Sequence, residues 1–120
     1  MKTIGYITPE MAALVGITLN KPEPVFLGQS NIAHMQAKHP ADYTKYGVDI
    51  SKIIAAPDYI GLNAKDDSFE LVKEYVMNGE YVKVAVRVSG SGKYFARSLY
   101  VLNNSRVKNY IAKGTLKPTT

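Results

Sequence analysis

Valine occupies every second position of the stretch "YVKVAVRV", residues 81–88, and this period of two predicts a β-strand with one buried face. The opposite face of that strand would carry Tyr81, Lys83, Ala85 and Arg87. The run "KYFARSLYVL", residues 93–102, also alternates, with Phe95, Arg97, Leu99 and Val101 on one side and Tyr94, Ala96, Ser98 and Tyr100 on the other. The pattern leaves open which of these two sides lies beside Lys83 and Arg87.

Two more strands are predicted before these, in "YIGLN" (59–63) and "SFELVKEYVM" (68–77). Asn78-Gly79 separates the second of them from residues 80–88, and Asn-Gly between two such runs is the strongest short-range signal for a β-hairpin. The stretch "SGSG", residues 89–92, predicts the next turn. The four strands should therefore form an antiparallel meander.

The first half of the chain contains residues that typically begin and end short helices. An extended "TIGYIT" should lead into a helix that Thr8 caps and Pro9 begins, and "VFLGQ" should be a short strand that leads to Ser30, a candidate N-cap. The helix after Ser30 contains "HMQAKHP" and should end by Pro40. A further short helix, "ADYTKYG", should stop at Gly47.

Two later helices are predicted by their apolar faces. In "DISKIIAAP", Ile50, Ile53 and Ile54 share one side and should point into a core. In "SRVKNYIAKG" the apolar face would be Val107, Tyr110 and Ile111, with Gly114 as the stop. We therefore expect one α+β domain over residues 1–120, with N-terminal helices packed on a four-stranded antiparallel meander sheet and a C-terminal helix. Residues 1–24 would be a strand and helix extension to a core of residues 25–117.

The amino-acid composition limits the kinds of partner that the protein is expected to bind. Hydrophobic residues make up 46% of the 120 residues and charged residues 21%, values that are ordinary for a soluble globular protein. No run is long and apolar enough for a membrane span or a signal peptide, so we expect no membrane partner. The chain has no cysteine, which favours a reducing cytoplasm. A net charge of +5 and nine tyrosines suit an anionic partner with unpaired bases, although a basic protein without such a partner would look the same.

Both histidines lie in "HMQAKHP". His34 and Lys38 are four residues apart and share a helix face, whereas His34 and His39 lie about 140° apart around the axis at ~100° per residue. That spacing does not suit joint binding of a metal, and we expect neither a metal nor another cofactor. Imidazole can move protons during attack of a ribose 2′-hydroxyl on phosphate, while lysine or arginine neutralises the developing charge. A helix end capped by "KHP" is the structural alternative.

The longer runs resemble a known family. The segments "LGQSNIAHMQAKHPADYTKYGVDISKIIAAPDYIGLN" and "YVKVAVRVSGSGKYFARSLYVLNNSRVKNYIAKGTLK" are similar to the phage-type members of the Barnase–EndoU–Colicin–RelE nucleases, over roughly residues 25 to 117. The resemblance implies helices on an antiparallel sheet and metal-independent cleavage of RNA, such as tRNA or mRNA, through a 2′,3′-cyclic phosphate. It implies catalytic roles for His34, His39, Lys38, Arg97 and Ser98. It also implies a role for Lys83 or Arg87 on the sheet. Because rings beside basic groups can stack on unpaired bases, we expect RNA-binding roles for Lys83, Arg87, Tyr81, Tyr100 and Arg106.

Three functions remain open at this level. The first is an endoribonuclease that serves a phage or mobile element as a toxin or anti-host effector, with His39 somewhat favoured over His34 because a "KHP" helix end can face the sheet edge. The second is an inactive RNA-binding module on the same fold, because fold alone does not imply activity. The third is a protein-interaction domain, for example one recognised by an immunity protein, an antitoxin or a host protein.

Overall fold

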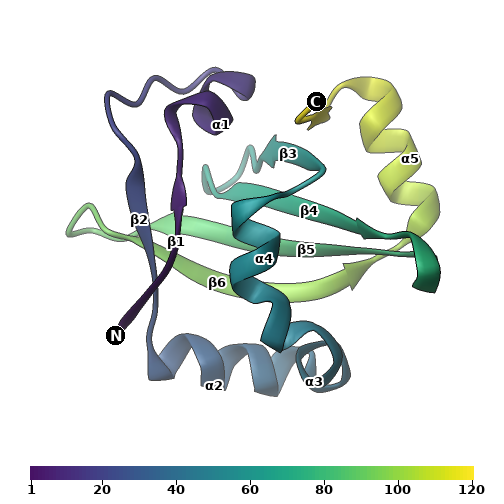
Figure 1. Cartoon of the computed structure of the whole chain (residues 1–120), viewed down its shortest axis with the longest axis horizontal. Coiled ribbons are helices and arrows are strands. Elements are labelled where there is room, and N and C mark those ends of the chain that lie inside the picture. The colour runs from purple at the N-terminus through teal and green to yellow at the C-terminus, as the bar shows by residue number, and fades with distance from the viewer.

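The computed structural model describes all residues, Met1–Thr120, and is built around one seven-stranded sheet (Figure 1). The strands are β1 (Lys2–Ile7), β2 (Glu23–Leu27), β3 (Tyr59–Leu62), β4 (Phe69–Tyr75), β5 (Glu80–Val88), β6 (Tyr94–Leu102) and β7 (Leu116–Pro118). Their order across the sheet is β1-β2-β6-β5-β4-β3-β7. The α+β class and the central antiparallel meander β3-β4-β5-β6 match the sequence prediction.

The prediction that the sheet contains only the four strands of the meander was wrong. Strand β2 joins β6 in parallel through only two residue pairs, Val25↔Tyr94 and Phe26↔Phe95, and β1 pairs with β2 at the sheet edge. At the other edge, β7 adds to β3. These pairings join segments that are far apart in sequence, so no local turn signal predicts them. Residues 1–24 thus contribute a strand to the sheet, and Ile7 and Ala12 belong to the main core.

Five α-helices and two 3₁₀ turns complete the fold. They are α1 (Pro9–Leu14), α2 (Gln29–Lys38), α3 (Pro40–Tyr46), α4 (Ile50–Ala55), α5 (Asn104–Lys113), η1 (Gly47–Asp49) and η2 (Val76–Asn78). The predicted caps at Thr8 and Gly114 are confirmed: Thr8 Oγ1 accepts a hydrogen bond from Met11 N at 3.1 Å, and Gly114 has φ 78°.

One predicted boundary, the N-cap of α2, was wrong. Gly28, not Ser30, is the N-cap of α2, and its N–H donates to Asn31 Oδ1 at 2.9 Å, so Ser30 lies inside the first turn. Helix α3 ends at Tyr46 with Gly47 as its C-cap, as predicted, but the φ of Gly47 is −57°, so the backbone stays right-handed and continues through η1 into α4. The Asn-Gly hairpin is present but wider than a two-residue turn, with η2 and Gly79 between β4 and β5.

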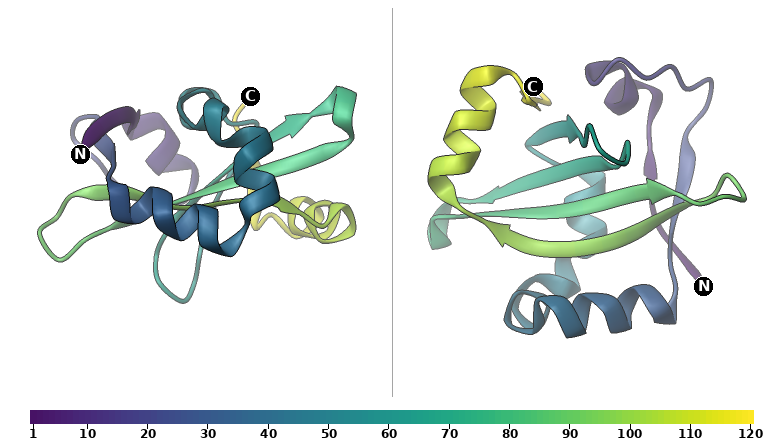
Figure 2. Two further views of the ribbon diagram at one scale, coloured as in Figure 1. Left: turned by 90° about the horizontal axis from the view of Figure 1, so that it is seen from below. Right: turned by 180° about the vertical axis from the view of Figure 1, so that it is seen from behind.

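The two faces of the sheet are covered differently. The main core lies on the face that packs against α4, and it includes the three isoleucines of α4 and the alternate valines of β5. The second face carries a smaller cluster around Val72, Val107 and Leu116, where α5 and β7 pack. Seen from below, α4 and α5 lie on opposite sides of the sheet (Figure 2, left). Helix α5 covers only part of the second face, and the rest of β5 and β6 is open (Figure 2, right).

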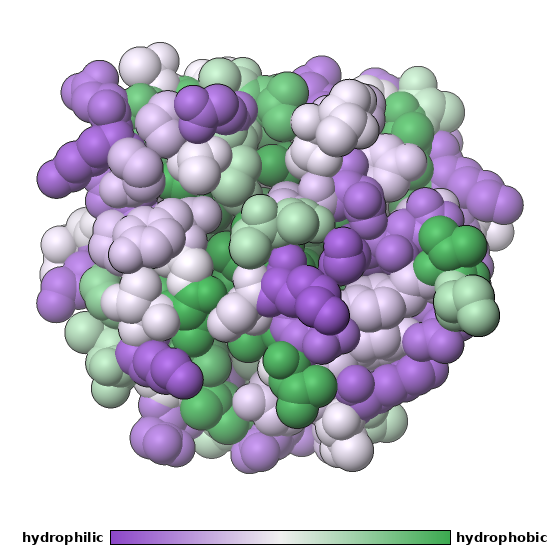
Figure 3. All heavy atoms as spheres, viewed as in Figure 1, coloured by the Kyte–Doolittle hydropathy of each residue, from purple (hydrophilic) through white to green (hydrophobic).

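On the side of α4, hydrophilic and hydrophobic residues are interspersed over the surface (Figure 3). None of the helices combines the length and the apolar character needed to cross a lipid bilayer. The second face of the sheet, partly covered by α5, holds the cavities described next.

Candidate nucleic-acid site

The open face of β5 and β6 is organised by a bulge at Arg97. Up to Ala85↔Ser98 the two strands pair regularly, but the next pair is Val86↔Ala96, so Arg97 has no partner across the ladder. Cross-strand partners share a face, which places Tyr100 beside Lys83 and Phe95 beside Arg87. The sequence pattern left open which side of β6 lies beside Lys83 and Arg87. Because the alternation of β6 breaks at Arg97, Tyr100 and Phe95, which the pattern put on opposite sides, both lie on that face.

Four side chains form a row across this face. The His39 ring stacks on the Tyr100 ring, with centroids 4.6 Å apart and an angle of 23° between the planes. Lys83 Nζ lies 4.8 Å from the centroid of Tyr100 and 2.8 Å from Glu70 Oε2. The row therefore joins the α2–α3 junction to β6, β5 and β4 in turn.

Helix packing brings His39 to this row. Strand β2 pairs with β6 only near Tyr94 and Phe95, which leaves the remainder of that edge free for α2 and α3. On α3, Asp42 Oδ2 accepts a hydrogen bond at 3.0 Å from Val101 N on β6. His39 is the residue between α2 and α3, and its backbone N–H donates to Met35 O at 3.0 Å. The backbone of His39 therefore ends one helix while its ring contacts the sheet.

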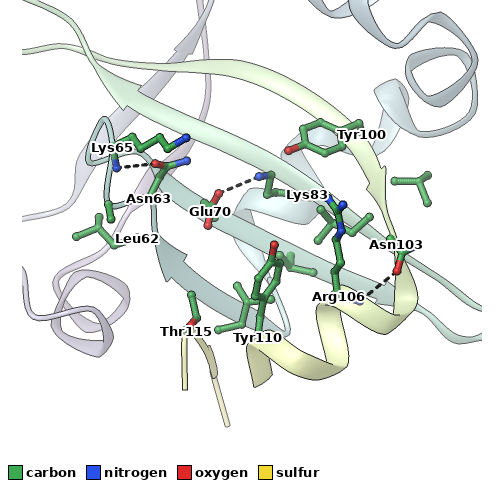
Figure 4. A pocket seen from close by; sticks show the side chains of 15 residues that line it. Leu62, Asn63, Lys65, Glu70, Lys83, Tyr100, Asn103, Arg106, Tyr110 and Thr115 are labelled. Atoms are coloured by element: carbon green, nitrogen blue, oxygen red, sulfur yellow. Dashed lines mark hydrogen bonds and ion pairs between the residues drawn. The ribbon is translucent and has the colours of Figure 1, made fainter. Parts of the chain in front are cut away.

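A cavity of about 560 Å³ opens between α5, the β3–β4 loop and the sheet (Figure 4). Figure 4 shows Arg106 and Tyr110 extending from α5 toward the Lys83–Glu70 pair, with Asn63 and Lys65 on the opposite rim. The cavity is lined by Leu62, Asn63, Ala64, Lys65, Glu70, Val72, Lys83, Tyr100, Val101, Leu102, Asn103, Arg106, Tyr110, Thr115 and Leu116. We call it the central cavity.

The Lys83–Glu70 pair is sheltered, with side chains only 13% and 16% exposed. Burial by itself would lower the pKa of Lys83, but the Glu70 carboxylate and the Tyr100 side chain outweigh it and hold that pKa above its ordinary value. Lys83 is therefore a fixed positive charge at the floor of the central cavity. The lining also contains Lys65 and Arg106, against the single carboxylate of Glu70. This balance suits an anionic ligand.

A second cavity, of about 540 Å³, lies near the bulge. We call it the bulge cavity, and its lining is Met1, Gly28, Ser30, Asn31, His34, Arg87, Ser89, Phe95 and Arg97. Its charged or titratable side chains are His34, Arg87 and Arg97, and it contains no carboxylate. The two histidines of "HMQAKHP" therefore lie in different places: His34 lines the bulge cavity, whereas His39 stacks on Tyr100, a residue of the central cavity.

The structure sorts the residues named from the sequence into three groups. Lys83, Tyr100 and Arg106 line the central cavity with His39 beside them, whereas His34, Arg87 and Arg97 line the bulge cavity. Ser98 faces Ala85 between the two cavities. Lys38 is exposed on α2, and Tyr81 packs in the small cluster under α5, with its ring 6.5 Å from that of Tyr59. Lys38 and Tyr81 line neither cavity.

Sequence reasoning missed Glu70, Asn63, Lys65 and Tyr110. Glu70 could have been found, because the hairpin register pairs Glu70 with Ala85 and so sets it diagonally across from Lys83 on the same face. Tyr110 was read as part of the apolar face of α5, yet it is 36% exposed and lines the central cavity. Asn63 and Lys65 come from a loop whose position no local pattern predicts. No group of three or more His, Cys, Asp or Glu side chains is arranged to hold a metal ion.

Comparison with known families identifies the class of protein. The family described as phage-Barnase-EndoU-ColicinE5/D-RelE like nuclease3 matches residues 1–109, nearly the whole chain. The chain belongs to this nuclease family, as the resemblance in its sequence predicted. No curated protein and no solved structure matches it significantly. Membership makes the chain a phage-type, nuclease-like protein with a nucleic acid as the implied substrate.

Proposed function

We propose that this protein is a metal-independent endoribonuclease whose active site is the central cavity. The observation that supports the proposal is the row His39, Tyr100, Lys83 and Glu70, which brings an imidazole, a fixed cation and a carboxylate together on one open sheet face. RNA carries its own nucleophile, the ribose 2′-hydroxyl. A site that cleaves it needs one group to accept a proton, one to donate a proton, and a charge that stabilises the phosphorane-like transition state.

In the proposed reaction, the Glu70 carboxylate accepts the proton of the 2′-hydroxyl as the 2′-oxygen forms a bond to phosphorus. The bond from phosphorus to the 5′-oxygen breaks, and protonated His39 gives its proton to that leaving oxygen. Lys83 and Arg106 stabilise the negative charge on the phosphate oxygens. The products are a 2′,3′-cyclic phosphate and a free 5′-hydroxyl, so atoms and charges balance without a further reactant.

The biological role follows from the same chemistry. We propose that the enzyme acts in the cytoplasm on a host RNA, such as tRNA or mRNA, as a toxin or anti-host effector of a phage or mobile element. The family's phage description supports this role. An immunity protein, an antitoxin or a host protein that covered the open sheet face would block the reaction, since every group of the row is reached from that side.

The test is incubation of the purified protein with total tRNA in EDTA, next to Glu70→Gln and His39→Ala variants. We expect discrete fragments with cyclic phosphate ends from the wild type, and a loss of about 10² to 10⁴-fold in each variant. A synthetic RNA with a single 2′-deoxyribose at the mapped cleavage site should resist cleavage, because it lacks the nucleophile. Equal cleavage of the deoxy-substituted RNA, or full activity of both variants, would overturn the proposed mechanism.

An RNA-binding module without catalysis is the second candidate. The observation that favours it is that Lys83 and Glu70 already satisfy each other, as in a purely structural ion pair. Such a module would bind tRNA with a salt-dependent affinity and leave it intact. In that case neither the wild type nor Glu70→Gln would cleave tRNA, and the substitution would change only the stability of the protein.

A further inference from the structure

The bulge cavity contains two guanidinium groups without an ion-pair partner. The only side-chain ion pairs within 4.0 Å are Lys45–Glu80 and Lys83–Glu70, so neither Arg87 nor Arg97 has one. Arg87 does act on the charge of Asp66, on the β3–β4 loop, but the pKa of Asp66 is lowered mainly by hydrogen bonds with Ser68 and only in small part by Arg87. Both arginines are exposed, so their charges remain available to a ligand.

The bulge is what brings these two arginines together. Without it, Arg97 would continue the alternation of Leu99 and point to the core face. The slip between Ala85↔Ser98 and Val86↔Ala96 instead lets Arg97 line the same cavity as Arg87 and Phe95. Bulges redirect side chains in this way, and they are frequent beside functional sites. Arg97 therefore serves this open surface and takes no part in the main core.

The bulge cavity and the central cavity lie on one continuous face. Lys83 and Arg87 project from the same side of β5, four residues apart, and at ~3.3 Å per residue they are separated by about 13 Å along the strand. Between them the cross-strand pair is Ala85 and Ser98, two small side chains that leave the surface low. A stacked strand rises about 3.4 Å per nucleotide, so this interval corresponds to at most about four nucleotides.

We infer that the bulge cavity is a second phosphate-binding subsite for the RNA backbone. This inference rests on the proposed function and extends it to the path of the substrate. A single-stranded RNA lies along β5 and β6, with its scissile phosphate at Lys83 and a remote phosphate between Arg87 and Arg97. His34 provides a further hydrogen-bonding group at that remote phosphate. Unpaired bases can stack on exposed rings such as Tyr110, which a closed duplex would not allow. The enzyme therefore selects single strands of several nucleotides over dinucleotides.

The experiment compares a dinucleotide, which has one phosphate, with a single-stranded hexanucleotide that contains the same cleavable step. The variants are wild type, Arg87→Gln/Arg97→Gln, and Lys21→Gln/Lys52→Gln. The last variant removes the same two charges from exposed positions outside both cavities. We expect the arginine variant to lose at least about ten-fold in kcat/KM on the hexanucleotide, and to cleave the dinucleotide as the wild type does. The lysine variant should match the wild type on both substrates.

Binding of the hexanucleotide gives an independent readout, measured by fluorescence anisotropy against salt. Each phosphate contact on a single strand contributes about 0.7 to the slope of log affinity against log salt, so the arginine variant should have a slope smaller by about 0.7 for one lost phosphate. If the wild type cuts neither substrate, the proposed function fails, but a weaker and less salt-dependent binding by the arginine variant would still support the subsite. An equal loss on both substrates, an equal loss in the lysine variant, or unchanged binding would overturn the subsite.

Discussion

The His39 ring lies flat against the Tyr100 ring, with centroids 4.6 Å apart and planes inclined by 23°. His39 is the residue between α2 and α3, whereas Tyr100 lies toward the C-terminal end of β6 and also contacts the Lys83 ammonium group. Tyr100 therefore lies between the titratable ring of His39 and the sheltered Lys83–Glu70 pair on the open sheet face. The His39 ring combines a packing role with the proton-transfer role that we propose, and the two can be separated by substitution.

Replacing His39 with phenylalanine should abolish cleavage and preserve the fold. Phenylalanine keeps an aromatic ring on Tyr100, and such a contact contributes about 0.5–1.5 kcal/mol beyond burial, but it cannot donate a proton. We expect a loss of about 10² to 10⁴-fold in the rate of RNA cleavage and a urea midpoint close to that of the wild type. His39→Ala should lose both activity and some stability. Appreciable activity in His39→Phe would exclude His39 as the proton donor.

Removal of Lys83 should destabilise the protein in a pH-dependent way. The Lys83→Met variant leaves the sheltered Glu70 carboxylate without its partner, and we expect a cost of about 1–3 kcal/mol at pH 7. The pKa of Lys83 is higher in the folded protein than its ordinary value of 10.5. The unfolded chain therefore loses this proton first, so the stabilisation is complete below about pH 10.5 and fades as the pH rises through the folded pKa.

Urea unfolding of wild type and Lys83→Met at pH 7, 9 and 11 measures this effect. The stability difference between them should be constant from pH 7 to 9 and smaller at pH 11. The matched control is the double variant Glu70→Gln/Lys83→Met, in which neither charge is left alone, and which should keep most of the wild-type stability. A difference that grows at alkaline pH would contradict the raised pKa of Lys83.

Asp42 should stabilise the protein more than a helix-terminal carboxylate usually does. It accepts a hydrogen bond from Val101 N on the free edge of β6, and Asp42→Ala would leave that edge group unpaired. We expect a loss of about 2 kcal/mol, together with reduced RNA cleavage because α3 would no longer hold His39 against Tyr100. The matched control is Glu10→Ala, since Glu10 is also an acid in the first turn after a proline but is exposed and has no such bond.

Glu10→Ala should cost less than about 1 kcal/mol, the size of an exposed charge at a helix N-terminus, and should leave RNA cleavage unchanged. Chemical unfolding and tRNA cleavage of the two variants measure both effects. Equal stability losses in Asp42→Ala and Glu10→Ala would show that the bond to Val101 adds nothing.

Local signals predicted the meander and the helices well. The valine period of β5, the Asn-Gly hairpin and the cap at Thr8 act over a few residues, so each could be read without knowledge of the fold. The pairing of β1, β2 and β7 with the meander could not be predicted in the same way. Strand β7, for example, docks where Gly61 has no side chain, and a Cβ built there would lie 2.8 Å from Thr115 O. That fit depends on two segments more than 50 residues apart.

The candidate site was only partly predictable for a related reason. Residue types suggested His34, His39, Lys83 and Arg97 as one set, yet His34 and Arg97 line the bulge cavity, whereas Lys83 lines the central cavity and His39 lies beside it on Tyr100. This division depends on two features. The five-residue spacing of the histidines can be read from the sequence, but the bulge at Arg97 cannot. A bulge has no alternation signal of its own, because it is the point at which the alternation changes sides.

Deletion of Arg97 should keep the fold and remove the remote phosphate contact. The register changes by one residue at this position, so a β6 without Arg97 can pair regularly with β5 from Tyr94 to Leu102. The main core should persist, because Ala96 and Leu99 already face it on either side of the bulge. We expect circular dichroism and urea unfolding close to those of the wild type, and weaker binding of a single-stranded hexanucleotide. Arg97→Gln keeps the bulge but not the charge, and it should bind the hexanucleotide as weakly as the deletion variant does. If the deletion variant fails to fold while Arg97→Gln is stable, the bulge is required for the fold as well as for the position of Arg97.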